Sequence, residues 1–119
     1  MKLEVIKIKP NYLPMLDIIE IKNSIIYSDG SELNLVNIND VRLKKLELDK
    51  YIVAIYIEPI TDDEGIHYDL SSYPMEKNIS LKGTTIFGDI IIIRMIENNF
   101  YSLSMNEIDT YIKKLNNEI

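Results

Sequence analysis

The chain has 119 residues, of which 46% are hydrophobic and 27% are charged, with a formal net charge of −6 and no cysteine. This length and composition are typical of one globular domain with an aliphatic core, so we expect a single domain over residues 1–119. The lack of cysteine excludes disulfides, thiol nucleophiles and the usual zinc sites. The acidic balance argues against direct binding of a nucleic acid backbone. No signal peptide and no membrane-spanning apolar run are visible, so we expect a cytoplasmic protein.

The beginning of the chain predicts two paired strands. Lysines alternate with apolar residues, which predicts an edge strand with Leu3 and Val5 toward the core and with Lys7 and Lys9 toward solvent. Residues 17–22 predict a second strand that pairs back on the first.

Residues 39–49 have an ambiguous pattern. Val41 and Leu43 alternate as in a strand, but Leu46 and Leu48 resume the alternation out of phase, so a strand needs a bulge to keep both pairs inside. The alternative is a helix capped by Asn39, which also divides these apolar residues between two sides. Periodicity does not decide between the two.

Two apolar segments predict the central strands of a sheet. Residues 51–57 are almost continuously apolar, as in a strand that is covered on both faces. Residues 90–93 are four isoleucines, and β-branched side chains favour a packed, pleated surface. Asn98 and Asn99 then predict a two-residue hairpin turn, because asparagine tolerates the left-handed backbone of such turns.

The C-terminal segment predicts a helix. Ser104 and Glu107 have the spacing of a capping box, in which each side chain accepts a hydrogen bond from the backbone amide of the other residue. Apolar residues recur at helical spacing from Ile108 to Leu115. We expect this helix to lie across the two central strands.

No pattern predicts a catalytic residue, a metal site or a cofactor. His67 is the only histidine, whereas a zinc site normally needs several histidine or cysteine ligands. Serine does not occur in a nucleophile elbow, and the spacing of Gly83 and Gly88 matches no phosphate-binding motif.

The candidate partner-binding residues lie in the segments after residue 60. They are the acidic residues Asp62, Asp63 and Glu64 and the tyrosines Tyr68 and Tyr73. Acidic side chains in a loop suit a basic partner, and tyrosine supplies a large contact area at low entropy cost. The alternative is that these side chains are simply solvated.

A series of short segments resembles a known family. The series consists of residues 39–43 leading into Tyr51 and Ile52, Gly88-Asp89 before apolar residues, residues 100–103, and a short C-terminal helix. It is similar to a group of small uncharacterised proteins, a domain-of-unknown-function family on phages and plasmids of Gram-positive bacteria. The resemblance implies that residues 39 to about 49 are helical. It also implies a mobile-element setting, in which small acidic proteins often bind and inhibit a host factor such as a restriction or CRISPR component.

The elements together predict an α+β fold with a mostly antiparallel sheet of about five to seven strands packed by two helices, the second of them C-terminal. We interpret the protein as a non-catalytic protein-interaction module, a phage or mobile-element inhibitor of a host nucleic-acid-processing or defence protein with a basic surface. Alternatives are a small-molecule or nucleotide binder with a pocket roofed by residues 70–82, an enzyme that works through carboxylates alone, and self-association through an edge strand. No membrane partner is expected.

Overall fold

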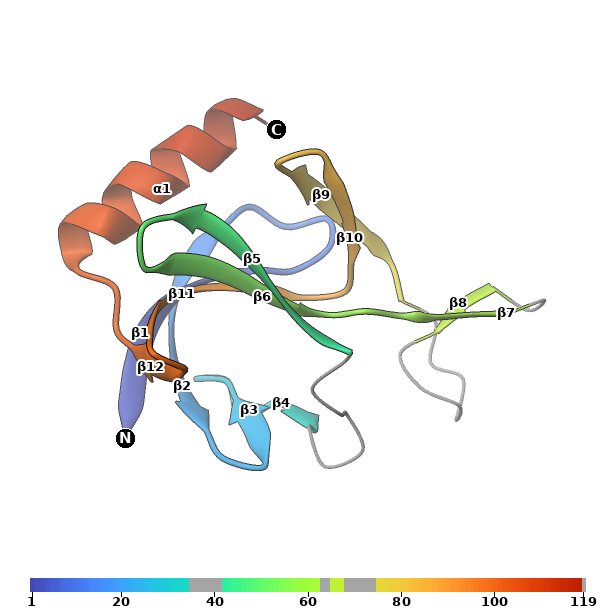
Figure 1. Cartoon of the computed structure of the whole chain (residues 1–119), viewed down its shortest axis with the longest axis horizontal. Coiled ribbons are helices and arrows are strands. Elements are labelled where there is room, and N and C mark those ends of the chain that lie inside the picture. Colours follow the sequence, from blue (N-terminus) through green and yellow to red (C-terminus); the bar gives the residue numbers. More distant parts are fainter. Residues whose placement is uncertain (35–41, 63–64, 68–74, 119) are drawn as a thin grey trace.

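The computed structural model describes residues 1–34, 42–62, 65–67 and 75–118, which form strands followed by a C-terminal helix (Figure 1). The elements are β1 (Lys2–Ile8), β2 (Met15–Ile21), β3 (Ser24–Ile26), β4 (Glu32–Asn34), β5 (Leu43–Asp49), β6 (Ile52–Ile57), β7 (Ile60–Asp62), β8 (Gly65–His67), β9 (Lys77–Leu81), β10 (Thr84–Phe87), β11 (Ile90–Ile96), β12 (Asn99–Tyr101) and α1 (Met105–Glu118).

Eight of the strands form one antiparallel sheet that curls into a half-barrel (Figure 1). The order across the sheet is β4-β3-β2-β1-β11-β6-β5, and β12 pairs with β11 off this path. Inward side chains of β2 and β3 share one core with those of β6, although these strands are not neighbours in the sheet. The hairpins β7–β8 and β9–β10 are separate two-stranded sheets.

Both faces of the curled sheet are buried over its central strands. The core on the inner face consists of Leu3, Val5, Ile19, Ile25, Tyr27, Val53, Ile55, Ile91 and Ile93. The core on the outer face consists of Ile6, Ile8, Ile52, Ala54, Ile90 and Ile92 beneath Leu81, Ile86, Leu103, Ile108 and Leu115 of β9, β10 and the C-terminal segment. Because successive side chains of a strand point to opposite faces, the continuous apolar runs of β6 and β11 supply both cores.

The segment between β11 and α1 joins the start of β1 to the end of β11. β12 pairs with residues 94–96 of β11. Beyond β12, the Leu103 N–H donates to the Glu4 carbonyl at 2.9 Å, and the Glu4 N–H donates to Ser102 Oγ at 2.9 Å. These bonds satisfy backbone groups of β1 that β11 does not reach.

The predicted capping box at the start of α1 is confirmed. The Glu107 N–H donates to Ser104 Oγ at 3.2 Å, and the Ser104 N–H donates to Glu107 Oε1 at 2.9 Å. Two of the amides that a helix N-terminus leaves without an intrahelical partner are therefore satisfied. Ile108 and Leu115 of α1 pack on the outer face, as the helical spacing predicted.

The expected α+β fold with two helices is wrong. The described part of the chain is mostly strand, and α1 is its one helix. Residues 43–49, which the resemblance implied to be helical, form β5 and pair with β6. As a strand, these residues satisfy their backbone N–H and C=O groups by hydrogen bonds to β6, just as a helix would satisfy them internally. Their weak helical periodicity therefore gives a helix no advantage over the strand. Residues 39–41, with the candidate cap Asn39, lie outside the described residues.

The leucines of β5 are out of phase because the strand carries leucines on both of its faces. The register with β6 is unbroken from Leu43 to Glu47, so Leu43 and Leu46 point to opposite faces. Leu46 and Leu48 pack on the outer core. The register shift lies between Glu47 and Asp49, so no bulge separates Leu43 from Leu46.

The first strand also differs from its prediction. β1 is central, between β2 and β11, and is not an edge strand. Lys7 is 3% exposed instead of pointing to solvent. Its side chain is on the same face as that of Val5, and the curled sheet encloses that face.

The hairpin turn after β11 is present but begins one residue early. Glu97 and Asn98 have positive φ values of 50° and 68°, and Asn99 already belongs to β12. The predicted central position of β6 and the pairing of β2 with β1 are confirmed.

Candidate functional site

Of the five predicted partner-binding residues, the structure describes only Asp62, which belongs to the β7–β8 hairpin. This hairpin extends away from the main sheet (Figure 1). Asp62 ends β7. Asp63, Glu64, Tyr68 and Tyr73 lie outside the described residues. The contact role of this group stays a prediction.

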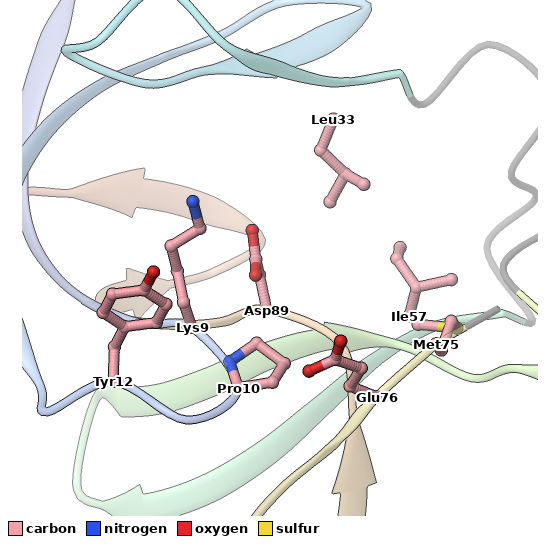
Figure 2. Close-up of a pocket in the computed structure, with 9 residues that line it drawn as sticks. Lys9, Pro10, Tyr12, Leu33, Ile57, Met75, Glu76 and Asp89 are labelled. Atoms are coloured by element: carbon pink, nitrogen blue, oxygen red, sulfur yellow. The ribbon is translucent and has the colours of Figure 1, made fainter. Parts of the chain in front are cut away.

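A pocket of about 330 Å³, here called the mouth pocket, opens where several strands of the half-barrel end (Figure 2). The lining comes from the ends of β1, β6 and β11, from β4, and from the segments next to them. It consists of Lys9, Pro10, Tyr12, Leu33, Ile57, Met75, Glu76, Gly88 and Asp89. Apolar groups form most of this wall, with one ammonium and two carboxylates among them.

The register of the sheet places Lys9 next to Asp89. Lys7 of β1 pairs with Ile91 of β11. Lys9 follows Lys7 by two positions and Asp89 precedes Ile91 by two, so alternation directs both side chains to the inner face, one layer beyond Lys7. Figure 2 shows the ammonium of Lys9 and the carboxylate of Asp89 side by side, on the same side of the pocket.

A buried ion pair lies next to this layer. Lys7 Nζ is 3.9 Å from Asp17 Oδ2, with side-chain exposures of 4% and 6%. Lys7 Nζ is also 3.6 Å from the ring centroid of Tyr27. The Ile18 N–H donates to the other carboxylate oxygen of Asp17 at 2.8 Å. Each buried charge therefore has compensating contacts.

Lys9 and Asp89 differ from this internal pair. Among the described residues, neither side chain forms a hydrogen bond or an ion pair within 4 Å. Lys9 Nζ lies 5.9 Å from the ring centroid of Tyr12, a weak cation–π contact. Both side chains are half-buried. Two opposite charges at the pocket wall are thus available to a ligand.

The other carboxylates near the pocket are already engaged. Glu76 Oε2 accepts a hydrogen bond from Asn11 Nδ2 at 2.7 Å. Asp29 Oδ1, in the β3–β4 turn, accepts from the Ser31 hydroxyl at 2.6 Å and from the Ser31 N–H at 2.9 Å. These two hydrogen bonds lower the pKa of Asp29, and the charges of Lys7 and Lys9 lower it further.

Contacts of the Gly88 backbone and of the Asn78 side chain hold the wall of the pocket. Gly88 has φ +78°, and a Cβ added to it would lie 2.5 Å from Met75 Cε. Asn78 is 8% exposed and donates from Nδ2 to the carbonyls of Ile8, at 2.9 Å, and Gly88, at 2.7 Å. The Met75 side chain therefore approaches Gly88 too closely for any residue with a Cβ, and Asn78 ties the end of β1 to the residues before β11.

A second surface lies on the outer face of β2, which α1 does not cover. The outer core includes residues of β1, β11 and β6 but none of β2. Leu16 and Ile18 of β2 are each 43% exposed, and Leu13, two residues before the strand, is 62% exposed; these three residues are here called the β2 strip. A hollow of about 330 Å³ adjoins Ile18. Its other lining residues are Lys2, Ile19, Glu20, Ile26, Tyr27 and Ser28.

Sequence patterns alone did not identify either surface. Lys9 was expected in solvent, and Asp89 and Asn78 were not predicted to belong to a site. The sequence does contain one signal for the position of Lys9. Residues 3, 5, 7 and 9 lie on the same face of a strand, so Lys7 and Lys9 share the apolar face of Leu3 and Val5.

Within the described part of the chain, no three His, Cys, Asp or Glu side chains are grouped to hold a metal ion. His67 lies in β8, opposite Ile60. No helix there is both long and apolar enough to cross a bilayer. No family model, curated protein or solved structure has a significant match to this chain.

Proposed function

We propose that the protein is a non-catalytic protein-interaction module that uses the β2 strip as its contact surface. The observation that carries the proposal is the exposure of Leu16 and Ile18 on the face that α1 covers over the neighbouring strands, with Leu13 exposed just before β2. Burial of apolar surface favours association by about 25 cal/mol per Å². Grouped apolar side chains with polar neighbours are typical of interaction surfaces.

The charges beside the strip favour a partner with basic groups around an apolar contact. Glu4 lies opposite Ile18 in the β1–β2 ladder, and Glu20 follows Ile18 on the same face of β2. Lys22 lies 3.4 Å from Glu20 and offsets part of this charge. The net charge of the chain is −6. Charge complementarity across an interface speeds association and selects among partners.

The proposed partner is a host nucleic-acid-processing or defence protein, since such proteins expose basic surfaces that bind nucleic acid. The module would cover that surface without binding nucleic acid itself. The resemblance to phage- and plasmid-borne proteins supports an inhibitor from a mobile element, acting in the cytoplasm.

The test is a quantitative pull-down from bacterial lysate with the wild-type chain and the double variant Leu16→Thr/Ile18→Thr. Threonine is β-branched, which suits a strand, and it removes apolar surface at both positions. We expect the wild type to retain a defined protein whose capture weakens with salt, and we expect the double variant to lose it.

The matched control is Tyr101→Thr in β12, because Tyr101 is also 43% exposed. This variant should retain the partner. Equal retention by all three proteins, or no retained protein at low salt, contradicts the proposal. Light scattering distinguishes a further outcome: if the wild type is dimeric and the double variant monomeric, the strip contacts a second copy.

A further inference from the structure

We propose that the mouth pocket binds a small zwitterion with neighbouring ammonium and carboxylate groups and an apolar side chain, such as a free apolar α-amino acid. Lys9 pairs with the ligand carboxylate and Asp89 with the ligand ammonium. Leu33, Ile57 and Met75 contact the apolar side chain. None of these residues belongs to the β2 strip, so this inference stands apart from the proposed interaction function.

The charges of the wall fit a zwitterion better than an ion of one sign. A simple anion would gain Lys9 but would also meet the carboxylate of Asp89, with Glu76 in the same wall. A simple cation would gain Asp89 but would meet the ammonium of Lys9. A zwitterion pairs both groups at once, and charge-assisted hydrogen bonds of this kind are the strong ones. A nucleotide fits less well, because Lys9 is the one cationic side chain in the described lining.

The size and the apolar wall limit the ligand further. About 330 Å³ is near the lower end of the range of small-molecule pockets. Figure 2 shows Leu33 across the pocket from Lys9 and Asp89, with Ile57 and Met75 at one side. A ligand therefore presents its charges to one wall and its apolar part to the others. An aliphatic amino acid has this arrangement.

The charged pair lies directly at the ends of two paired strands. Lys9 directly follows β1 and Asp89 directly precedes β11. The side-chain amide of Asn78 bridges the carbonyls of Ile8 and Gly88, the residues next to Lys9 and Asp89 in sequence. A pre-formed pair of this kind loses little entropy when a ligand binds. Neither side chain has to break an ion pair with another described residue in order to bind the ligand.

In the test, L-leucine is titrated into the full chain, and binding is monitored by amide chemical shifts and by calorimetry. We expect saturable shifts centred on the amides of Leu33, Gly88 and Asp89. Two matched analogues each lack one charge: 3-methylbutylamine has no carboxylate, and 4-methylpentanoate has no ammonium. Each analogue should bind at least about tenfold more weakly, because one charge-assisted hydrogen bond is lost.

Two variants test the assignment of each charge. Lys9→Met should weaken leucine binding about tenfold without weakening the binding of 3-methylbutylamine. Asp89→Asn should weaken leucine binding about tenfold without weakening the binding of 4-methylpentanoate. This reciprocal pattern would not arise from a general loss of structure. The matched control is Asp109→Asn/Lys113→Met, which removes two exposed charges from α1 and should bind leucine as the wild type does.

Three results would overturn the inference: no saturable shift with leucine, isoleucine, valine or methionine; equal binding of leucine and both analogues; or shifts that map away from the pocket. If a variant fails to fold, the analogue series on the wild-type chain still decides. Leu16→Thr/Ile18→Thr should retain leucine binding, so failure of one proposal does not imply failure of the other.

Discussion

Lys7 and Asp17 form the one fully buried ion pair among the described residues, 3.9 Å apart between Nζ and Oδ2. Two charges removed from water lose solvation, and in many proteins their attraction only roughly repays that loss. Here the ring of Tyr27 and the amide of Ile18 add compensating contacts. The pair can therefore persist in an apolar interior, but either partner alone would be an uncompensated charge.

We predict that Lys7→Met lowers the free energy of unfolding by about 3 kcal/mol, because Asp17 is left buried without its cation. The double variant Lys7→Met/Asp17→Leu should recover most of this loss, since both charges are replaced by apolar groups. Urea unfolding measures the double-mutant cycle.

Lys22→Met is the control for this cycle. The Lys22 side chain is 68% exposed, so its loss should change stability by less than about 0.5 kcal/mol. If Lys7→Met changed the free energy of unfolding as little as Lys22→Met does, Lys7 would not be enclosed by the half-barrel.

At the scale of elements, Glu107 links the start of α1 to β11. Its carboxylate accepts from the Ser104 N–H at 2.9 Å and pairs with Arg94 of β11. Burial alone would raise the pKa of Glu107, but the hydrogen bonds from Ser104 and Arg94 outweigh it, so the pKa is lowered from its ordinary value of 4.5. One side chain thus caps the helix and holds it to the sheet.

We predict that this contribution to stability is present at neutral pH and is lost in acid. Because the folded-state pKa of Glu107 is lowered, the stabilisation is complete above the unfolded-state pKa and disappears as the pH falls through the folded-state pKa. Glu107→Gln should therefore be less stable than the wild type at pH 7, and the difference should shrink as the pH falls through the lowered pKa of Glu107. Urea unfolding at several pH values measures it.

Ser104→Ala removes the other half of the capping box and should cost about 1 kcal/mol. A constant difference between the wild type and Glu107→Gln from neutral to acidic pH would show that the ionised carboxylate does not stabilise the helix N-terminus.

At the scale of the whole molecule, the β9–β10 hairpin connects the outer core to the mouth pocket. Leu81 and Ile86 of this hairpin pack in the outer core beside α1. From β9, Asn78 reaches the carbonyls of Ile8 and Gly88 at the end of the half-barrel. A separate two-stranded sheet therefore stabilises the geometry of the pocket.

We predict that Asn78→Leu lowers the free energy of unfolding by about 2–4 kcal/mol, because the buried carbonyl of Ile8 and the partly buried carbonyl of Gly88 lose their donor. Hydrogen exchange of the Ile90 and Gly88 amides should accelerate, since the ends of β1 and β11 are no longer tied together. Ser80→Ala, at an exposed position of the same strand, is the control and should change neither quantity. Unchanged exchange in Asn78→Leu would show that Asn78 does not hold this end of the sheet.

Features that depend on neighbours in sequence were predictable. The capping box of Ser104 and Glu107 and the central strand β6 were predicted, and the hairpin turn after β11 was predicted to within one residue. Each is set by backbone conformation or by periodicity within a few residues. The fold class, the strand identity of residues 43–49 and the buried position of Lys7 were not predicted.

By itself the sequence determined where the chain turns, where α1 begins and which strands are apolar on both sides. Only the tertiary structure decided that β1 is central, that the sheet curls, and that Lys9 and Asp89 meet at the mouth pocket. The physical reason is that alternation assigns a side chain to a face of a strand, whereas pairing between distant strands determines what covers that face. The exposed outer face of β2 and the neighbouring charges of Lys9 and Asp89 at the mouth pocket both arise from that distant pairing.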